Sequence, residues 1–188
     1  KLDVDAHVTT VLFNDQYKML YNRRELKDVR KMTDKDYTPG GMTALLDAVG
    51  RTIHKMDMVS GIHRKDKGNK VLFVIITDGE ENDSREYTYA DVKKLIKDRQ
   101  ENAGWEFIFL GANIDAVAAA ENLGIDRDRA VKYKNTGSGV RANFKAVAEL
   151  SDSLAKSGRV SDEWKETVEK DEDDAADKQS AAVTLHRR

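Results

Sequence analysis

Four carboxylates crowd the end of one apolar segment. The stretch VLFVIITDGEEND runs through six apolar residues and then places Asp78, Glu80, Glu81 and Asp83 around a single glycine. Asp78 is the first charged residue after the apolar run, so we expect its carboxylate at the boundary of a buried strand. Loss of water is costly for a carboxylate there unless hydrogen bonds or a cation compensate. A bound cation is the natural candidate.

The donors available near Asp78 predict which cation it would be. Oxygen atoms from Asp78, Thr43 and water are at hand, and the loops concerned contain neither histidine nor cysteine. Hard oxygen donors suit Mg²⁺, Mn²⁺ or Ca²⁺ and disfavour zinc or copper. We expect Asp78 and Thr43 to be ligands, whereas Glu80, Glu81 and Asp83 enrich local cations or accept a second one.

The predicted strands and helices place these residues at one sheet edge. In an open parallel sheet, ligands bind outside the carboxyl ends of the strands, where loops and helix N-termini converge. Loops begin there at Asn14, Asp78 and Gly111, and the loop TPGGMT precedes a helix that points to the same edge. The residues expected at the periphery of the site are Gly41, Asn14, Gly79, Glu80 and Asn113.

Each of these features also has a purely structural interpretation. Asp78 and Gly79 form one of the commonest turn pairs. Thr43 is a possible N-cap of the helix that it begins. Gly40 and Gly41 have the freedom to relieve backbone strain at the helix entry. The stretch DGEEND is no EF-hand loop, because it lacks the ligand alternation and the glycine at the sixth position.

Hydrophobic patterns predict alternating strands and helices. Apolar runs predict strands at Val8–Phe13, Lys18–Tyr21, Val71–Ile76, Trp105–Gly111 and Ala130–Tyr133. Helical spacing predicts helices from Leu45 to Met56, from Thr88 to near Gly104, at Asp115–Leu123 and at Val140–Leu154. This order is typical of an α/β protein with a doubly wound, mostly parallel sheet and helices on both faces, a Rossmann-like arrangement.

Composition excludes several classes of function. The 188 residues include 34 acidic and 32 basic ones, so overall charge indicates neither nucleic-acid binding nor attraction to a membrane surface. No cysteine is present, which excludes disulfides and thiol catalysis and favours a reducing compartment. We expect one domain over residues 1–158. The charged segment 159–188, with EKDEDD within it, is expected to be a flexible tail with a possible helical turn around Trp164.

Two motifs resemble those of a known family. GGMTALLDAVG and VLFVIITDGEEN, in this order, are similar to segments of the von Willebrand factor type A (vWA) domain family. The likeness covers about residues 4–156 and is closest to bacterial or phage intracellular members, which favours a cytoplasmic protein. In that family a metal-ion-dependent adhesion site combines an Asp-x-Ser-x-Ser motif, a threonine and an aspartate. The resemblance implies that Thr43 and Asp78 match the last two.

The sequence departs from the family in one respect. No Asp-x-Ser-x-Ser follows an apolar strand in it. In the family that motif follows a central first strand, and this sequence starts at the equivalent of the second strand. We therefore expect an upstream segment of some tens of residues; a strand from another polypeptide and a degenerate relative with altered pairing are the alternatives. Either neighbouring strand would otherwise carry unpaired backbone groups.

Three functions follow from these expectations. The first is a protein-interaction module that holds Mg²⁺ through oxygen ligands and binds an acidic residue of a partner protein, as the resemblance implies. The second is a metal-dependent phosphoryl-transfer enzyme or hydrolase with Asp78 and Glu80 as ligands, against which stands the lack of a nucleophile with a base. The third is a metal-free scaffold with a degenerate site.

Overall fold

The computed structural model describes residues 6–33, 35–38, 40–58, 70–161 and 163–169. The described residues form two compact units. Unit 1 contains residues 6–58 and 80–103, and unit 2 contains residues 70–79 and 104–169. The chain passes from unit 2 to unit 1 between Gly79 and Glu80, within the acidic motif itself. Most of the basic segment HRKDKGNK lies outside the described residues.

Unit 1 begins with a β-hairpin. Strand β1 (His7–Phe13) pairs antiparallel with β2 (Tyr17–Glu25). The turn between them closes through Asn14, whose Oδ1 accepts a hydrogen bond from the Gln16 N–H at 2.7 Å, because a short amide side chain readily mimics a backbone turn. The strand expected at residues 8–13 is confirmed, and its partner is longer than the expected 18–21.

Two helices complete unit 1. Helices α1 (Leu45–Asp57) and α2 (Tyr89–Asp98) pack on each other and bury Ile53, Val92 and Ile96 completely. Helix α2 starts with a capping box, because the Thr88 hydroxyl accepts from the Asp91 N–H while the Asp91 carboxylate accepts from the Thr88 N–H. A single π-helical turn, Arg99–Ala103, follows α2.

Unit 2 contains a parallel sheet. Its strands are β3 (Leu72–Thr77), β4 (Glu106–Gly111) and β5 (Ala130–Lys132), in the spatial order β3-β4-β5. All three strands run parallel. Ile108, Phe109 and Leu110 in the central strand are fully buried, as expected for a strand covered on both faces. The protein is thus a mixed α/β structure with a small parallel sheet.

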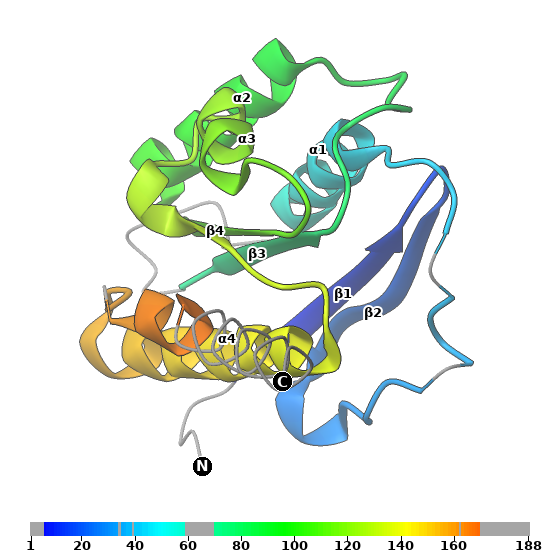
Figure 1. Cartoon of the computed structure of the whole chain (residues 1–188). Helices are drawn as coiled ribbons and strands as arrows, with labels where there is room; N and C mark the ends of the chain where they lie inside the picture. Colours follow the sequence, from blue (N-terminus) through cyan, green and yellow to red (C-terminus); the bar gives the residue numbers. More distant parts are fainter. Residues whose placement is uncertain (1–5, 34, 39, 59–69, 162, 170–188) are drawn as a thin grey trace, which may run out of the picture. The chain divides into compact units, whose positions relative to one another are not determined.

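Two helices cover this sheet. Helix α3 (Ala116–Leu123) and helix α4 (Gly137–Ser157) lie on opposite sides of the strands in Figure 1. The predicted ends of α3 are confirmed. Asp115 caps its N-terminus by accepting from the Ala118 N–H, and Gly124 ends it in the left-handed conformation at φ 81°. Helix α4 packs Ala146, Leu150 and Leu154 into one core cluster with Ile108 and Leu110.

The core of unit 2 extends beyond the expected domain boundary at residue 158. Val160, Trp164 and Val168 belong to the same cluster as the buried face of α4, and residues 164–169 form a helical turn. The charged residues around them hide this pattern, because only three apolar side chains mark the buried face. Packing therefore continues to Val168, and the part of the expected tail from residue 170 lies outside the described residues.

Among the described residues, no helix is long and apolar enough to cross a membrane.

Trp164 is the large side chain that anchors this segment to the core. Its exposed fraction is 2%, so Trp164→Ala should lower the free energy of unfolding by about 3–5 kcal/mol. Urea denaturation measured by circular dichroism checks this value. Phe144→Ala is the matched control, because Phe144 on α4 is 58% exposed and its loss should cost about 0.5 kcal/mol or less. Equal effects of the two changes would contradict the packing of residues 160–168.

Candidate functional site

Asp78 follows directly on β3, in unit 2. Its side chain is exposed rather than placed at a dry boundary, which corrects the expectation from the sequence. One carboxylate oxygen, Oδ2, accepts a hydrogen bond from the Asn135 side-chain amide at 3.1 Å. Thr77, buried below it, holds the turn, since its hydroxyl accepts from the Gly79 N–H and donates to the Gly79 carbonyl. The turn thus presents the Asp78 carboxylate to solvent.

Thr43 precedes α1, in unit 1. Its backbone N–H donates to Asn82 Oδ1 at 2.7 Å, and its carbonyl accepts from the Asn82 N–H at 3.0 Å. The N-cap of α1 is Ala44, which has no side-chain capping bond, so Thr43 is not the N-cap that the alternative interpretation proposes. These two bonds fix the backbone of Thr43 against the acidic loop that follows Asp78 in the chain.

The N-cap residue of α1 makes no side-chain capping bond, and Glu81 from the acidic loop caps the helix instead. Its Oε2 accepts from the Leu46 N–H at 2.9 Å and from the Ser84 hydroxyl at 2.8 Å. Its Oε1 accepts from the N–H groups of Asp83 and Ser84 at 3.1 and 2.8 Å. A carboxylate at a helix N-terminus is stabilised by the unpaired amides and by the helix dipole. Glu81 is therefore a structural residue and not the diffuse source of negative potential that the sequence suggests.

Asp47 holds the second half of the acidic loop. Asp47 is 7% exposed. Its carboxylate accepts hydrogen bonds from the backbone N–H groups of Arg85, Glu86 and Tyr87 at 2.9–3.0 Å. Burial raises the pKa of the Asp47 carboxyl, but these backbone hydrogen bonds and the nearby charge of Arg51 together hold the pKa below its usual value. The loop is thereby pinned to α1.

Two further contacts tighten the same region. Arg51 forms a bidentate ion pair with Glu86, with N···O distances of 2.7 and 2.6 Å. Gly50 lies against the ring of Tyr87, and a Cβ atom on Gly50 would come within 2.5 Å of that ring. A larger residue at position 50 therefore has no room in this packing.

The glycine-rich loop is closed by the hairpin turn of unit 1. Asn14 Nδ2 donates to the Gly40 carbonyl at 3.0 Å, and the Asn14 carbonyl accepts from the Ala44 N–H at 2.8 Å. Gly41 has φ +93°, and a Cβ atom on it would lie 2.7 Å from Asp15 Oδ1. The strain-relief interpretation of this glycine thus holds, and Asn14 and Gly41 lie together as expected.

The predicted site residues fall in both units. Unit 1 contains Thr43, Asn14, Gly41 and Glu80, and unit 2 contains Asp78, Gly79 and Asn113. Glu80 and Asn113 are exposed, and Asn113 adopts a left-handed conformation with φ 57°, which asparagine tolerates better than most residues. Hydrogen bonds join the loops of unit 1 to one another. Asp78, in unit 2, is hydrogen-bonded to Asn135 of the same unit.

The donor set is compatible with a hard cation. Asp78 offers an exposed carboxylate whose orientation is set by an amide donor, an arrangement that supports metal ligands in proteins. In the part of the chain that the structure describes, no three His, Asp or Glu side chains form a group able to hold a metal ion. Within the described residues, the carboxylates therefore do not form a complete set of metal ligands.

A cavity of about 300 Å³ lies in unit 1 between the hairpin turn, the first turns of α1 and the acidic loop. It is lined by Phe13, Asp15, Gln16, Tyr17, Ala44, Asp47, Ala48, Arg51, Asp83, Arg85 and Glu86. Its arginines are already paired, Arg51 with Glu86 and Arg85 with Asp83. Thr43 does not line this cavity, so it is not the site that the sequence predicts.

Comparisons with protein-family models, with curated proteins and with solved structures find no match for this chain.

Sequence reasoning missed Asp47 and Asn135. Asp47 falls within a helical pattern, where an acidic residue is normally assigned to the exposed face, so only its position among the apolar residues of that face signals burial. Asn135 is distant from Asp78 in the chain, and no short-range pattern connects the two.

Replacement of Asp47 by asparagine tests the role of this carboxylate. Asparagine keeps the size but presents a donor to N–H groups, so Asp47→Asn should lower the free energy of unfolding by about 2–3 kcal/mol at pH 7. Because the folded pKa is lowered, the stabilisation by Asp47 is present above the unfolded pKa of about 3.9 and is lost as pH falls through the folded pKa. The variant should lose this part of the acid dependence.

Urea denaturation at pH 7 and at a series of lower pH values measures both effects. Asp83→Asn is the control in the same loop, because Asp83 pairs at 3.2 Å with an Arg85 side chain that is 81% exposed, and such pairs contribute about 0–1 kcal/mol. Wild-type stability of Asp47→Asn at pH 7 would show that the loop does not depend on Asp47.

Proposed function

We propose that the protein is a vWA-type interaction module that binds a divalent cation, Mg²⁺ first, at Asp78 and Thr43 and engages an acidic residue of a partner protein there. The observation that carries this proposal is the exposed Asp78 carboxylate. It follows a parallel strand, in a turn that is held by hydrogen bonds of the Thr77 hydroxyl. Ligands of open parallel sheets bind at that end of the strands. The sequence resemblance supports the same two residues.

The finer architecture belongs to this proposal as well. A small parallel sheet with helices on either side is a coarse feature shared by doubly wound folds, of which the vWA fold is one. We infer that the protein has the doubly wound arrangement.

Chain connectivity supports a common role for Thr43 and Asp78. Both backbone groups of Thr43 are bonded to Asn82, and Asn82 lies four positions after Asp78. Four residues span at most about 14 Å when fully extended. The bonds to Asn82 thus join Thr43 to the segment that follows Asp78 in the chain, which supports the proposal.

Of the remaining acids of the loop, two are engaged in other interactions and one adds negative charge to the proposed site. Glu81 and Asp83 are engaged in the hydrogen bonds and the ion pair described above. Glu80 stays exposed and adds negative potential next to Asp78. A bound Mg²⁺ keeps exchangeable waters and would offer one coordination position to a carboxylate of the partner.

Metal binding by the natural polypeptide that contains this sequence tests the proposal. Titration with Mn²⁺ followed by electron paramagnetic resonance should detect a bound ion that Mg²⁺ displaces. Asp78→Ala should weaken Mn²⁺ binding at least about 100-fold, since it removes the only charged ligand assigned here. Thr43→Val should weaken it less, because it removes a neutral ligand.

Asp128→Asn serves as the matched control, because Asp128 is an exposed carboxylate of unit 2 outside the site and should bind Mn²⁺ as the wild type does. Wild-type affinity in Asp78→Ala would refute the metal site and favour the metal-free scaffold. Mn²⁺-dependent hydrolysis of a phosphate ester that Asp78→Asn abolishes would favour the enzyme instead.

A further inference from the structure

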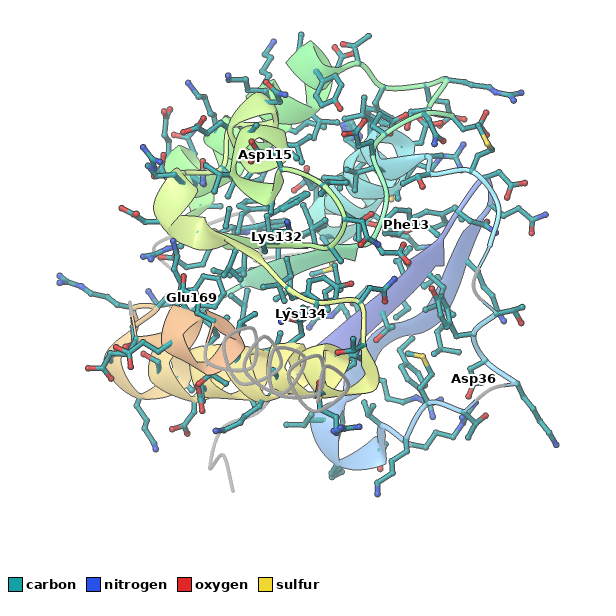
Figure 2. The ribbon with its side chains drawn as sticks, in the orientation of Figure 1. Phe13, Asp36, Asp115, Lys132, Lys134 and Glu169 are labelled. Carbon is teal, nitrogen blue, oxygen red and sulfur yellow. The ribbon has the colours of Figure 1, made fainter. Side chains whose placement is uncertain are left out.

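Helix α4 has a solvent-facing side that carries no charge. The buried side of the helix packs into the core of unit 2, and Figure 2 shows other side chains of α4 that project away from the parallel sheet of that unit. The outer side of a surface helix normally carries charged and polar residues. Along α4, uncharged residues instead follow one another on this side at helical spacing. They are Val140, Phe144, Ala148, Ser151 and Ala155, which we call the α4 face.

The N-terminal half of the α4 face is apolar and in contact with solvent. Val140 is 37% exposed and Phe144 is 58% exposed. The two residues are four positions apart, so their side chains are neighbours on the helix surface. Single exposed apolar residues are normal in proteins, whereas contiguous ones mark surfaces that bind another molecule.

The C-terminal half of the α4 face consists of small residues. Ala148 and Ala155 are exposed, and Ser151 is half-buried. The Ser151 hydroxyl already donates to the Val147 carbonyl at 2.7 Å, so covering this hydroxyl would cost little. The face therefore has large side chains in its first half and room beside the helix in its second half.

The charged residues along one border of the α4 face also differ between its two halves. Arg141 and Lys145 come first, and Glu149 and Asp152 follow on the same side of the helix. Both acids are near lysines one turn away on α4, Glu149 at 3.8 Å from Lys145 and Asp152 at 2.5 Å from Lys156. Exposed pairs of this kind are weak, so they exchange partners at little cost.

An antiparallel pair of α4 helices would match these charges. In a two-fold symmetric pair each helix presents the same surface to the other. With the axis between Ala146 and Val147, Arg141 of each copy is level with Asp152 of the other, and the two charged borders lie on the same side of the pair. A parallel pair would instead place Arg141 beside Arg141, which is unfavourable.

The same arrangement would fit large side chains against small ones. With a rise of 1.5 Å per residue, Phe144 of one copy falls between Ala148 and Ser151 of the other. Val140 falls between Ser151 and Ala155. Close packing of this kind, in which side chains of one helix fill the spaces between those of the next, is what stabilises helix pairs.

We propose that the α4 face is a dimer interface, at which two copies of the chain pack their α4 helices antiparallel. The occupant is a second copy because the two halves of the face complement each other in both size and charge. This inference is independent of the proposed metal site, since none of the residues of the face belongs to that site.

The size of the interface predicts a weak dimer. Helix α4 has 21 residues and is about 30 Å long. A single helix pair of this length gives an interface at the lower end of the specific range, which is typical of transient complexes. We expect a dissociation constant of about 10–100 µM. In dilute solution the chain is then largely monomeric, and the effect of Phe144→Ala on unfolding there stays small.

Sedimentation equilibrium of the 188-residue chain in EDTA measures self-association without any contribution from metal. The wild type should follow a monomer–dimer equilibrium. Phe144→Ala should raise the dissociation constant at least about 10-fold, since each dimer loses two buried rings. Leu26→Ala is the matched control, because Leu26 in unit 1 is 45% exposed and its loss should leave the constant unchanged. A chain that stays monomeric at about 1 mM, or a dimer that Phe144→Ala does not weaken, would overturn the proposal.

Charge reversal tests the antiparallel arrangement. Arg141→Asp and Asp152→Arg each bring like charges together across such a pair, and each should raise the dissociation constant about 10-fold. The double variant restores opposite charges and should return the constant to within about 3-fold of the wild-type value. A double variant that associates as weakly as the single ones would contradict the antiparallel pairing and overturn the proposal.

Discussion

The buried carboxylate of Asp47 is the constraint on which the described half of the site depends. A loop of five polar residues such as NDSRE has no apolar side chains to bury and no regular structure of its own. Three backbone N–H groups donate hydrogen bonds to the Asp47 carboxylate, and Glu81 accepts one from the start of α1. Together these bonds hold the loop in a single position. Charged acceptors of this kind form the stronger class of hydrogen bonds.

This arrangement distinguishes carboxylates that are held by backbone amides from carboxylates that are exposed. Glu81 and Asp47 are saturated by amides and serve the structure. Asp78 and Glu80 remain exposed. The acids that appear in the sequence as one cluster thus differ in role, because Glu81 is anchored by hydrogen bonds whereas Asp78 and Glu80 are exposed. The exposed carboxylates are the ones available for a ligand.

Local signals predict most of the secondary structure, because their causes are local. The Thr88 capping box, the Gly124 stop and the apolar runs of β3 and β4 each act within a few residues, and the structure confirms them. Long-range contacts leave no such trace. The bond between Asp78 and Asn135 joins residues 57 positions apart, and Trp164 lies among charges that mask its buried face. The metal site stays a prediction, since its two proposed ligands lie in different units.

The most direct measurement is the anomalous diffraction of Mn²⁺ in crystals of the natural polypeptide. Our account predicts a peak about 2.2 Å from an Asp78 carboxylate oxygen, the distance expected for a small divalent ion with oxygen ligands, and a contact from Thr43, directly or through water. A peak at another place on the protein, or none at Asp78 at millimolar Mn²⁺, would contradict it.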